Sequence, residues 1–261
     1  MSYVYIDGAS LDLAILEFAK ELGHASIPFD YGLFLNNLSA TRAFYYDALP
    51  AKKDATGTAS EYESKKAEKE QFFSRLNRVP RLHVRYGTTK WAKKEGQNQK
   101  AVDVLLAVDV LTHAHSQPDY TATIVTSDLD FQPLFSALLQ TPVITRLYYR
   151  PNHTNTDLIE SADWAFKITH NLLLRSCDPS FAAPYFPAHS SNPDFAFAEP
   201  DGAEVEIVER GQPYHFWKDV NGYWIARLQT LSWRARTLPL LSEQLFGEQA
   251  DEVVKRVLAP R

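Results

Sequence analysis

Two short apolar runs that each end in carboxylates constrain the fold of this chain more than any other feature. Residues 2–6 lead directly to Asp7, and residues 122–127 lead to Asp128 and Asp130. Short runs rich in β-branched and aromatic side chains are typical of strands buried in a parallel sheet. In open α/β sheets, ligands bind beyond the carboxyl ends of the strands. We therefore expect an α/β fold in which these carboxylates meet at one crevice.

Strand and helix patterns alternate through the first part of the chain. The strand patterns are 2–7, 41–47, 81–86, 121–126 and 142–149, and the helical patterns are 10–22, 29–38, a solvated helix ending near 78, 100–115 and 131–140. Alternation of this kind predicts parallel βαβ units. The expected fold is a layered α/β domain with a mostly parallel sheet flanked by helices.

The composition changes after residue 175. Residues 176–202 hold five prolines with Ser and Ala between them, which predicts a semi-rigid linker. Beyond it, Asn221-Gly222 is a hairpin turn signal within an antiparallel sheet. The strand patterns there are 205–208, 213–217 and 223–228, followed by a helical pattern near 239–258. We therefore predict an α/β domain over 1–175, the linker, and a small β-rich domain with a terminal helix over 203–261.

The predicted C-terminal domain is rich in aromatic and arginine side chains. They are Trp217, Tyr223, Trp224 and Trp233, with Arg227, Arg234 and Arg236. Aromatic side chains commonly fill the cores of small domains, and this is the commoner use of such residues. The same residues also suit a face that binds nucleic acid or protein. Both interpretations stay open from the sequence.

The bulk composition excludes several classes of protein. The 261 residues carry a formal net charge of −5 and are 45% hydrophobic, as is typical of a soluble globular chain. The single cysteine, Cys177, excludes an internal disulfide and a cysteine-based zinc site, and it suits a reducing cytoplasm. No apolar run approaches the roughly 20 residues of a membrane span. The first strand leaves no room for a signal peptide, so we expect a cytoplasmic protein without a membrane partner.

Two further carboxylates lie in the apolar helix predicted for 100–115, which we expect to be buried on most sides. Asp103 is in its first turn, where it can reach the crevice beyond the strand ends. Asp109 lies six residues further on and points roughly 120° away from Asp103. We place Asp103 in the site and give Asp109 a supporting or structural role. An aspartate after a strand also commonly caps a turn or helix, and Asp128 or Asp130 could do so here.

Four segments of the chain resemble the NYN domain family, a group of PIN-like nuclease domains that includes the bacterial LabA-like proteins. They are Tyr5-Ile-Asp7-Gly-Ala-Ser10-Leu, Ala43-Phe-Tyr-Tyr-Asp47, Lys100-Ala-Val-Asp103-Val-Leu-Leu-Ala-Val-Asp109 and Ile124-Val-Thr-Ser-Asp128-Leu-Asp130-Phe-Gln-Pro133. They match the family in order and spacing, and Leu158-Ile-Glu-Ser-Ala-Asp163 is similar to its closing motif. The resemblance covers about residues 1–175. It implies a PIN-like parallel sheet and an Mg²⁺- or Mn²⁺-dependent ribonuclease site.

The same resemblance assigns the site residues. It implies that the catalytic and metal-binding carboxylates are those of Asp7, Asp103, Asp128 and Asp130. Ser10 stands where the family often has Asn, and Thr126-Ser127 stands where the family usually has Ser-Gly. Ser10 can donate a hydrogen bond to a phosphate or to a metal-bound water. Ser10, Ser127 and Asp109 are the expected supporting residues.

The type of ligand selects the metal. Carboxylate oxygens suit Mg²⁺ or Mn²⁺ rather than zinc. One or two such ions can activate a water, orient the scissile phosphate and neutralise charge on the leaving oxygen. A histidine-based site is disfavoured, because His113 and His115 are two residues apart on a helix and do not share a face.

Basic side chains gather between Arg81 and Lys100. This segment holds six Lys or Arg residues, one Glu and Trp91. Such a mixture suits single-stranded nucleic acid, through phosphate contacts and base stacking. The expected nucleic-acid-binding residues are Arg85, Lys90, Trp91, Lys93, Lys94 and Lys100. A charged segment is also commonly a solvated loop, and this alternative stays open.

These observations together predict a metal-dependent endoribonuclease that hydrolyses RNA phosphodiester bonds. The alternative is a catalytically inactive regulator on the same fold that binds RNA or protein. A haloacid-dehalogenase-type phosphatase is disfavoured, because the chain lacks the Asp-x-Asp-x-Thr pattern of that class. RNA is the expected partner, and the terminal helix could mediate a homodimer.

Overall fold

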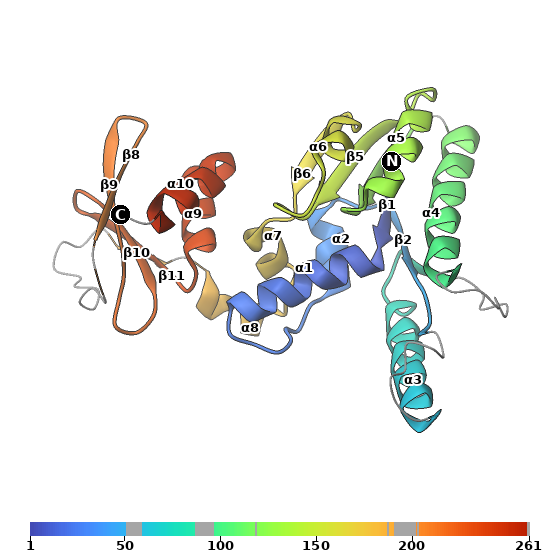
Figure 1. The fold of residues 1–261 in the computed structure, drawn as a ribbon, viewed down its shortest axis with the longest axis horizontal. Helices are drawn as coiled ribbons and strands as arrows, with labels where there is room; N and C mark the ends of the chain where they lie inside the picture. The colour runs from blue at the N-terminus through green and yellow to red at the C-terminus, as the bar shows by residue number, and fades with distance from the viewer. Residues whose placement is uncertain are drawn as a thin grey trace. The chain divides into compact units, whose positions relative to one another are not determined.

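The computed structural model describes residues 1–50, 59–86, 97–117, 119–186, 188–190, 202 and 204–259 (Figure 1). The chain divides into two compact units by its internal contacts. The first, here called the N-terminal unit, comprises Met1–Ile15 and Asp30–Ile168. The second, the C-terminal unit, comprises Leu16–Phe29 and Thr169–Arg261. Each unit has its own sheet.

The sheet of the N-terminal unit has six strands in the order β3-β2-β1-β4-β5-β6. The strands are β1 (Ser2–Asp7), β2 (Arg42–Asp47), β3 (Leu82–Tyr86), β4 (Thr121–Val125), β5 (Ile144–Tyr149) and β6 (Trp164–Lys167). All neighbouring strands in it pair in parallel. The chain first builds outward from β1 to β3, then returns to the other side of β1 with β4. The strand order therefore reverses between β1 and β4, which makes this pair the topological switch point.

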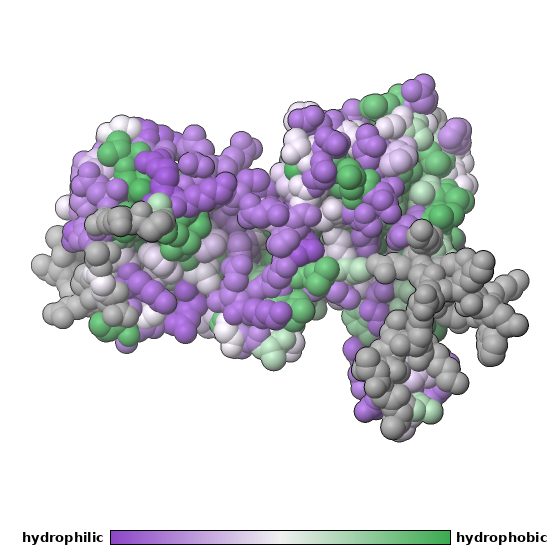
Figure 2. Space-filling model, in the orientation of Figure 1, coloured by the Kyte–Doolittle hydropathy of each residue, from purple (hydrophilic) through white to green (hydrophobic). Residues whose placement is uncertain are grey.

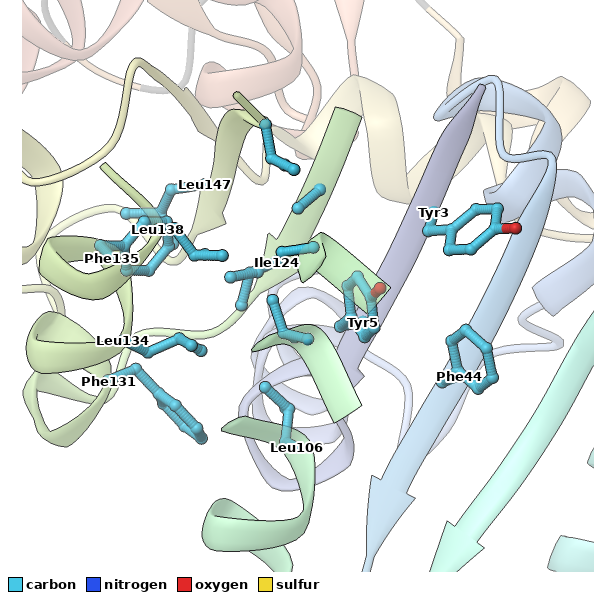
Figure 3. Packing of buried hydrophobic residues seen from close by; sticks show 14 of the residues in the cluster. Tyr3, Tyr5, Phe44, Leu106, Ile124, Phe131, Leu134, Phe135, Leu138 and Leu147 are labelled. Carbon is cyan, nitrogen blue, oxygen red and sulfur yellow. The ribbon is translucent and has the colours of Figure 1, made fainter. Parts of the chain in front are cut away.

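Helices cover both faces of this sheet. They are α1 (Gly8–Glu21), α2 (Tyr31–Asn37), α3 (Ala59–Leu76), α4 (Gln97–Ser116), α5 (Gln132–Leu138) and α6 (Thr156–Glu160), with a short 3-10 turn, η1, at Leu129–Phe131. Residues of α4 and α5 pack with Tyr5 and Ile124 in one buried cluster (Figure 3). On the opposite face, rings of α2 and α3 pack edge-on against Tyr45. The layered, mostly parallel architecture predicted from the sequence is confirmed.

Helix α4 is less buried than its apolar sequence led us to expect. Leu106 and Val110 point into the core and are almost fully buried. Val104 and Val108 are 61% and 52% exposed, and green apolar surface follows α4 in Figure 2. The expectation of burial on most sides was therefore wrong. An apolar helix is buried only where other elements pack on it, and the side of α4 that faces away from the sheet is exposed at Val104 and Val108. No helix among the described residues is both long and apolar enough to cross a bilayer.

The C-terminal unit contains a five-stranded antiparallel sheet in the order β7-β11-β10-β9-β8. The strands are β7 (Ala188–Ser190), β8 (Val205–Glu209), β9 (Gln212–Lys218), β10 (Trp224–Leu228) and β11 (Leu231–Ala235). The helical elements are α7 (His170–Arg175), α8 (Pro179–Ala182), η2 (Ala183–Tyr185), α9 (Leu238–Phe246), η3 (Gly247–Gln249) and α10 (Ala250–Leu258). One sheet face packs on α9, where the Tyr214 and Phe246 ring centroids are 4.9 Å apart.

The structure adds elements to those predicted for this part of the chain. The single helix expected near 239–258 is two helices, because Gly247 between them has a φ of 57° that an L-residue rarely adopts. Strand β11 was not predicted, and the segment expected to be a linker contains α8, η2 and β7. The predicted domain limits at 175 and 203 stay predictions. The hairpin signal is confirmed, since Gly222 has a φ of 79° in the turn between β9 and β10.

A polar network in the C-terminal unit joins α7 and α9 to Glu21, the last residue of α1. The Glu243 carboxylate on α9 accepts hydrogen bonds from the backbone N–H groups of His170 (2.9 Å) and Asn171 (2.8 Å) at the start of α7. The His170 ring lies 3.1 Å from Glu243 through Nδ1 and 2.7 Å from Glu21 through Nε2. Burial favours the neutral imidazole, but the hydrogen bonds to Glu21 and Glu243 outweigh burial and raise the pKa of His170 to about 9. The imidazolium therefore holds two carboxylates together.

This network predicts a specific loss of stability at high pH. Because the folded pKa of His170 lies above its unfolded value of about 6.5, its contribution is complete below pH 6.5. It disappears as the pH rises through about 9. We expect His170→Gln to lower the free energy of unfolding by up to about 3 kcal/mol at pH 6 and by much less at pH 10. Urea unfolding of both proteins at the two pH values measures this, and an equal deficit at both would contradict it.

Candidate functional site

The candidate site lies at the carboxyl ends of β1 and β4. Asp7 is the last residue of β1, and Asp128 is the third residue after the end of β4. The two strands are direct neighbours, with Ile6 paired to Val125. The structure therefore places Asp7 and Asp128 at the same edge of the sheet, at the point where the strand order reverses.

The Thr126 hydroxyl connects these two aspartates. It donates to Asp7 Oδ2 at 2.8 Å and accepts from the backbone N–H of Asp128 at 3.2 Å. The other Asp7 oxygen accepts from the backbone N–H of Ser10 at 3.3 Å, in the first turn of α1. Burial raises the pKa of Asp7, and the charge of Asp128 adds to this, while the hydrogen bonds from Thr126 and Ser10 oppose it. Asp7 is thus held in one orientation although its charge is disfavoured.

Asp128 also caps the 3-10 turn η1. Its carboxylate accepts from the backbone N–H of Asp130 at 3.0 Å. Asp128 therefore does cap this turn, as the sequence allowed. The cap holds its carboxylate close to the carboxyl end of β4. The neighbouring Ser127 hydroxyl accepts from the backbone N–H of Arg150 at 2.9 Å, which ties this loop to the end of β5.

Asp103 lies near the other three carboxylates. It is half-buried in the second turn of α4. Burial, followed by the negative charges of Asp7, Asp128 and Asp130, raises the pKa of Asp103 to about 6. Because the charges of Asp7, Asp128 and Asp130 all act on Asp103, we call these four predicted residues the carboxylate cluster.

Asp109 is bound by other side chains, and its contacts suit a structural role. Arg85 on β3 binds it through both branches of the guanidinium, with Nε–Oδ2 at 2.9 Å and Nη2–Oδ1 at 3.0 Å. The Tyr46 hydroxyl donates to the same carboxylate at 2.9 Å. Arg85, which the sequence suggested for nucleic-acid binding, therefore has its Nε and Nη2 groups engaged by Asp109.

The chemistry of the carboxylate cluster fits a divalent cation. Its donors are carboxylate oxygens, which Mg²⁺ and Mn²⁺ prefer. The mutual repulsion that disfavours the charge of Asp103 is the kind that a cation relieves. Within the part of the chain that the structure describes, the buried Ser10 hydroxyl in the first turn of α1 has no hydrogen-bond partner. Within the described residues, however, no three His, Cys, Asp or Glu side chains already converge as a formed metal cage.

A second charged cluster lies at the end of β2 and was not predicted. Lys69 on α3 contacts Asp47 (Nζ–Oδ2 2.5 Å) and Asp12 on α1 (Nζ–Oδ2 3.6 Å). The Tyr45 hydroxyl donates to Asp12 at 3.1 Å. A Cβ at Gly8 would lie 2.5 Å from the Tyr45 ring, so only glycine lets that ring approach the backbone beside Asp7. The sequence held one signal for this cluster. Asp12 lies in a predicted helix and has no Lys or Arg four residues before or after it.

The remaining predicted nucleic-acid-binding residues cannot be placed beside these clusters. Lys90, Trp91, Lys93 and Lys94 lie outside the described residues. Lys100 belongs to the first turn of α4, and its side chain also lies outside the described part of the chain. Their role in binding stays a prediction.

Comparison with known proteins identifies the N-terminal part of the chain. The sequence model of the NYN domain matches residues 2–169. A crystal structure of a protein of unknown function from Vibrio parahaemolyticus shares 20% sequence identity and a TM-score of 0.47 over 64% of this chain and 91% of that chain. No curated protein matches the chain.

The repulsion within the carboxylate cluster predicts a stabilising substitution. We expect Asp103→Asn to raise the free energy of unfolding in EDTA at pH 8 by about 1 kcal/mol, allowing for solvent screening of this half-buried group. The gain should shrink as the pH falls toward 4, because Asp103 is then protonated in the native protein.

Thermal or urea unfolding measures this effect. Asp157→Asn is the matched control, since Asp157 is exposed at the start of α6. An Asp103→Asn protein that is less stable than the wild type at pH 8 would contradict the repulsion described here.

Proposed function

Since the chain belongs to the NYN domain family, which is part of the PIN-like nuclease superfamily, we propose that it is a metal-dependent endoribonuclease hydrolysing RNA phosphodiester bonds. The observation that carries this proposal is the side-by-side ending of β1 and β4 at the switch point of the sheet, where the Thr126 hydroxyl joins Asp7 to Asp128. The charges of Asp7, Asp128 and Asp130 also act on Asp103 and, after burial, raise its pKa. Isolated surface aspartates are normally far enough apart to avoid such repulsion. We therefore infer that the four aspartates are kept together in order to bind a cation.

Each member of the site has a role that its contacts support. Asp7, Asp103, Asp128 and Asp130 would hold Mg²⁺ or Mn²⁺, and when bound the ion would supply an activated water and charge neutralisation at the phosphate. Thr126 positions Asp7 through its 2.8 Å hydrogen bond. The unpartnered hydroxyl of Ser10 is suited to donate to a phosphate oxygen of the substrate. Ser127 and Asp109 support the site by holding the loop after β4 and the β3 edge.

RNA is the proposed substrate because the family belongs to the PIN-like nucleases and because the sequence between Arg81 and Lys100, which precedes Asp103, is rich in basic residues. Lys90, Lys93, Lys94 and Lys100 with Trp91 would guide a single strand past the carboxylates. Arg85 would contribute only if it exchanged Asp109 for a phosphate. A cytoplasmic location and a homodimer remain part of the proposal.

A non-catalytic regulator on the same fold is the second candidate. One observation favours it: among the described residues the carboxylates do not already form a metal cage. A family position usually held by glycine is also Ser127 here, and its hydroxyl ties the loop to the end of β5. A stiffer loop would make it harder for Asp128 and Asp130 to adjust around an ion.

Cleavage of a labelled RNA by the full chain separates the two candidates. With Mn²⁺ or Mg²⁺ we expect cleavage that EDTA abolishes. Asp128→Asn should reduce the rate at least about 100-fold, since even outer-sphere partners of a metal are worth 10–100-fold. The protein should remain folded, because asparagine can keep the cap on η1.

Asp157→Asn serves again as the control and should cleave at the wild-type rate. If the wild type binds RNA without cutting it in either metal, the regulator is the correct assignment. If the Asp128→Asn protein retains full metal-dependent activity, the site lies elsewhere.

A further inference from the structure

Strands β5 and β6 carry aromatic side chains on one face of the sheet of the N-terminal unit. Side chains alternate along a strand, and paired residues of neighbouring strands share a face. The register pairs Arg146 with Trp164, and it pairs Tyr148 with Phe166. Leu147 points to the opposite face, where it is buried in the cluster that includes residues of α4 and α5. The four other side chains therefore lie on the face turned away from α4 and α5, here called the aromatic face.

The two aromatic rings of β6 are open to solvent. Trp164 is 60% exposed and Phe166 is 38% exposed, and β6 is the edge strand of the sheet (Figure 1). The rings of Phe166 and Tyr148 are stacked, with centroids 5.2 Å apart and an angle of 26° between their planes. Tyr148 thus supports one ring of the edge strand, and Trp164 stands beside this pair in contact with solvent.

The backbone of β6 sets a useful spacing between its two rings. Residues i and i+2 of a strand lie on one face and are about 6.6 Å apart. Flat groups in van der Waals contact are about 3.5 Å apart, so a ring held between two others needs about 7 Å. Trp164 and Phe166 are therefore placed at the separation that a nucleobase between them would require.

Arg146 adds a cation to the aromatic face. Its charge acts on Tyr148, where it opposes the burial that raises the pKa of the phenol. The buried Nε of Arg146 has no hydrogen-bond partner within the described residues. Asp163, which precedes Trp164, accepts from the backbone N–H and the hydroxyl of Thr145 at 2.8 Å and 2.7 Å. An arginine with an unused donor beside aromatic rings suits a phosphate whose base is stacked nearby.

The aromatic face is joined to the loop that carries the carboxylate cluster. The backbone N–H of Thr126 donates to the carbonyl oxygen of Tyr148 at 3.1 Å, and the backbone N–H of Arg150 donates to the Ser127 hydroxyl at 2.9 Å. Strand β6 is two strand spacings from β4, which is roughly 10 Å. A nucleic-acid strand with one phosphate at the carboxylate cluster would therefore bring a neighbouring base to Phe166.

The size of the aromatic face favours a base over a protein partner. Trp164 and Phe166 together expose roughly 200 Å² of ring surface. A stable protein interface takes roughly 800 Å² from each partner. A nucleobase needs only one or two rings on which to stack.

We propose that the aromatic face, formed by Arg146, Tyr148, Trp164 and Phe166, stacks a base of single-stranded RNA beside the phosphate at the carboxylate cluster. Aromatic side chains on an open sheet face are a common platform for unpaired RNA bases. Such a platform tolerates any sequence, because every base has a flat face. The inference rests on the proposed function in taking RNA as the ligand, and it adds a base-binding subsite to that function.

The fluorescence of 2-aminopurine, a base analogue that is quenched when it stacks, tests this proposal with the full chain. A short oligouridine in which 2-aminopurine replaces alternate bases is titrated in EDTA, so that binding is measured without cleavage. We expect the wild type to quench the analogue. Trp164→Ala should bind about tenfold more weakly and quench less, because a stacking partner is lost. Its slope of log affinity against log salt should equal that of the wild type, since no phosphate contact is removed.

Three further variants separate stacking from charge and from a folding defect. Trp164→Phe keeps a ring and should recover most of the affinity and the quenching. Arg146→Gln should lower the salt slope by about 0.7, the contribution of one phosphate contact on a single strand. Leu139→Ala is the matched control, because Leu139 is also 60% exposed but follows α5 on the other face of the sheet. This control should bind like the wild type.

Several results would overturn the proposal. They are a wild type that does not bind or does not quench the oligonucleotide, wild-type affinity in Trp164→Ala, and an equal loss of affinity in Leu139→Ala. A solution mass that rises with concentration in the wild type but not in Trp164→Ala, together with unchanged RNA binding, would assign the face to a second copy of the chain instead.

The nuclease assignment and this subsite can fail separately. If no variant cleaves RNA with Mn²⁺ while quenching still depends on Trp164, the nuclease activity is lost and the subsite stands. If the wild type cleaves RNA and Trp164→Ala cleaves it with the same KM and kcat, the nuclease stands and the subsite is lost.

Discussion

Strands β1 and β4 are neighbours because the order of the sheet reverses between them, and this pairing forces carboxylates together. Asp7 and Asp128 end adjacent strands, so neither can move far without breaking the sheet. Thr126 is completely buried between them and hydrogen-bonds to both residues. The free energy of packing thus holds in place charges that repel one another, which is the usual physical signature of a site preformed for a cation or a reaction. The coupling of Asp103 to this pair extends the same constraint to helix α4.

Much of this arrangement could be predicted, because the information is local. An apolar run that stops at an aspartate specifies a strand and its charged end, and the angle between Asp103 and Asp109 on a helix separates their roles. The contact of Arg85 with Asp109 could not be predicted, since it depends on the pairing of β3 with β2. The exposure of Val104 was missed for a similar reason, because a sequence does not reveal how many layers cover a helix.

The C-terminal unit shows the same limits of sequence reasoning in another form. Its aromatic residues suggested either a core or a binding face, and the register divides them between the two faces of the sheet. Trp217 and Tyr223 lie on the sheet face opposite α9, whereas Tyr214 and Phe216 pack against Phe246 of α9. The His170 network links the start of α7 to Glu243 and to Glu21, residues far apart in the sequence. These contacts arise from tertiary packing, so only the structure could supply them.

The central claim is that Asp7, Asp103, Asp128 and Asp130 act as one cluster that takes up a divalent cation. Calorimetric titration of Mn²⁺ into the metal-free full chain tests it most directly, with Asp103→Asn and Asp157→Asn measured alongside. We expect saturable binding to the wild type and the Asp157→Asn control, and binding weakened at least about tenfold in Asp103→Asn. Mn²⁺ affinity that is undetectable in the wild type, or equal in all three proteins, would contradict it.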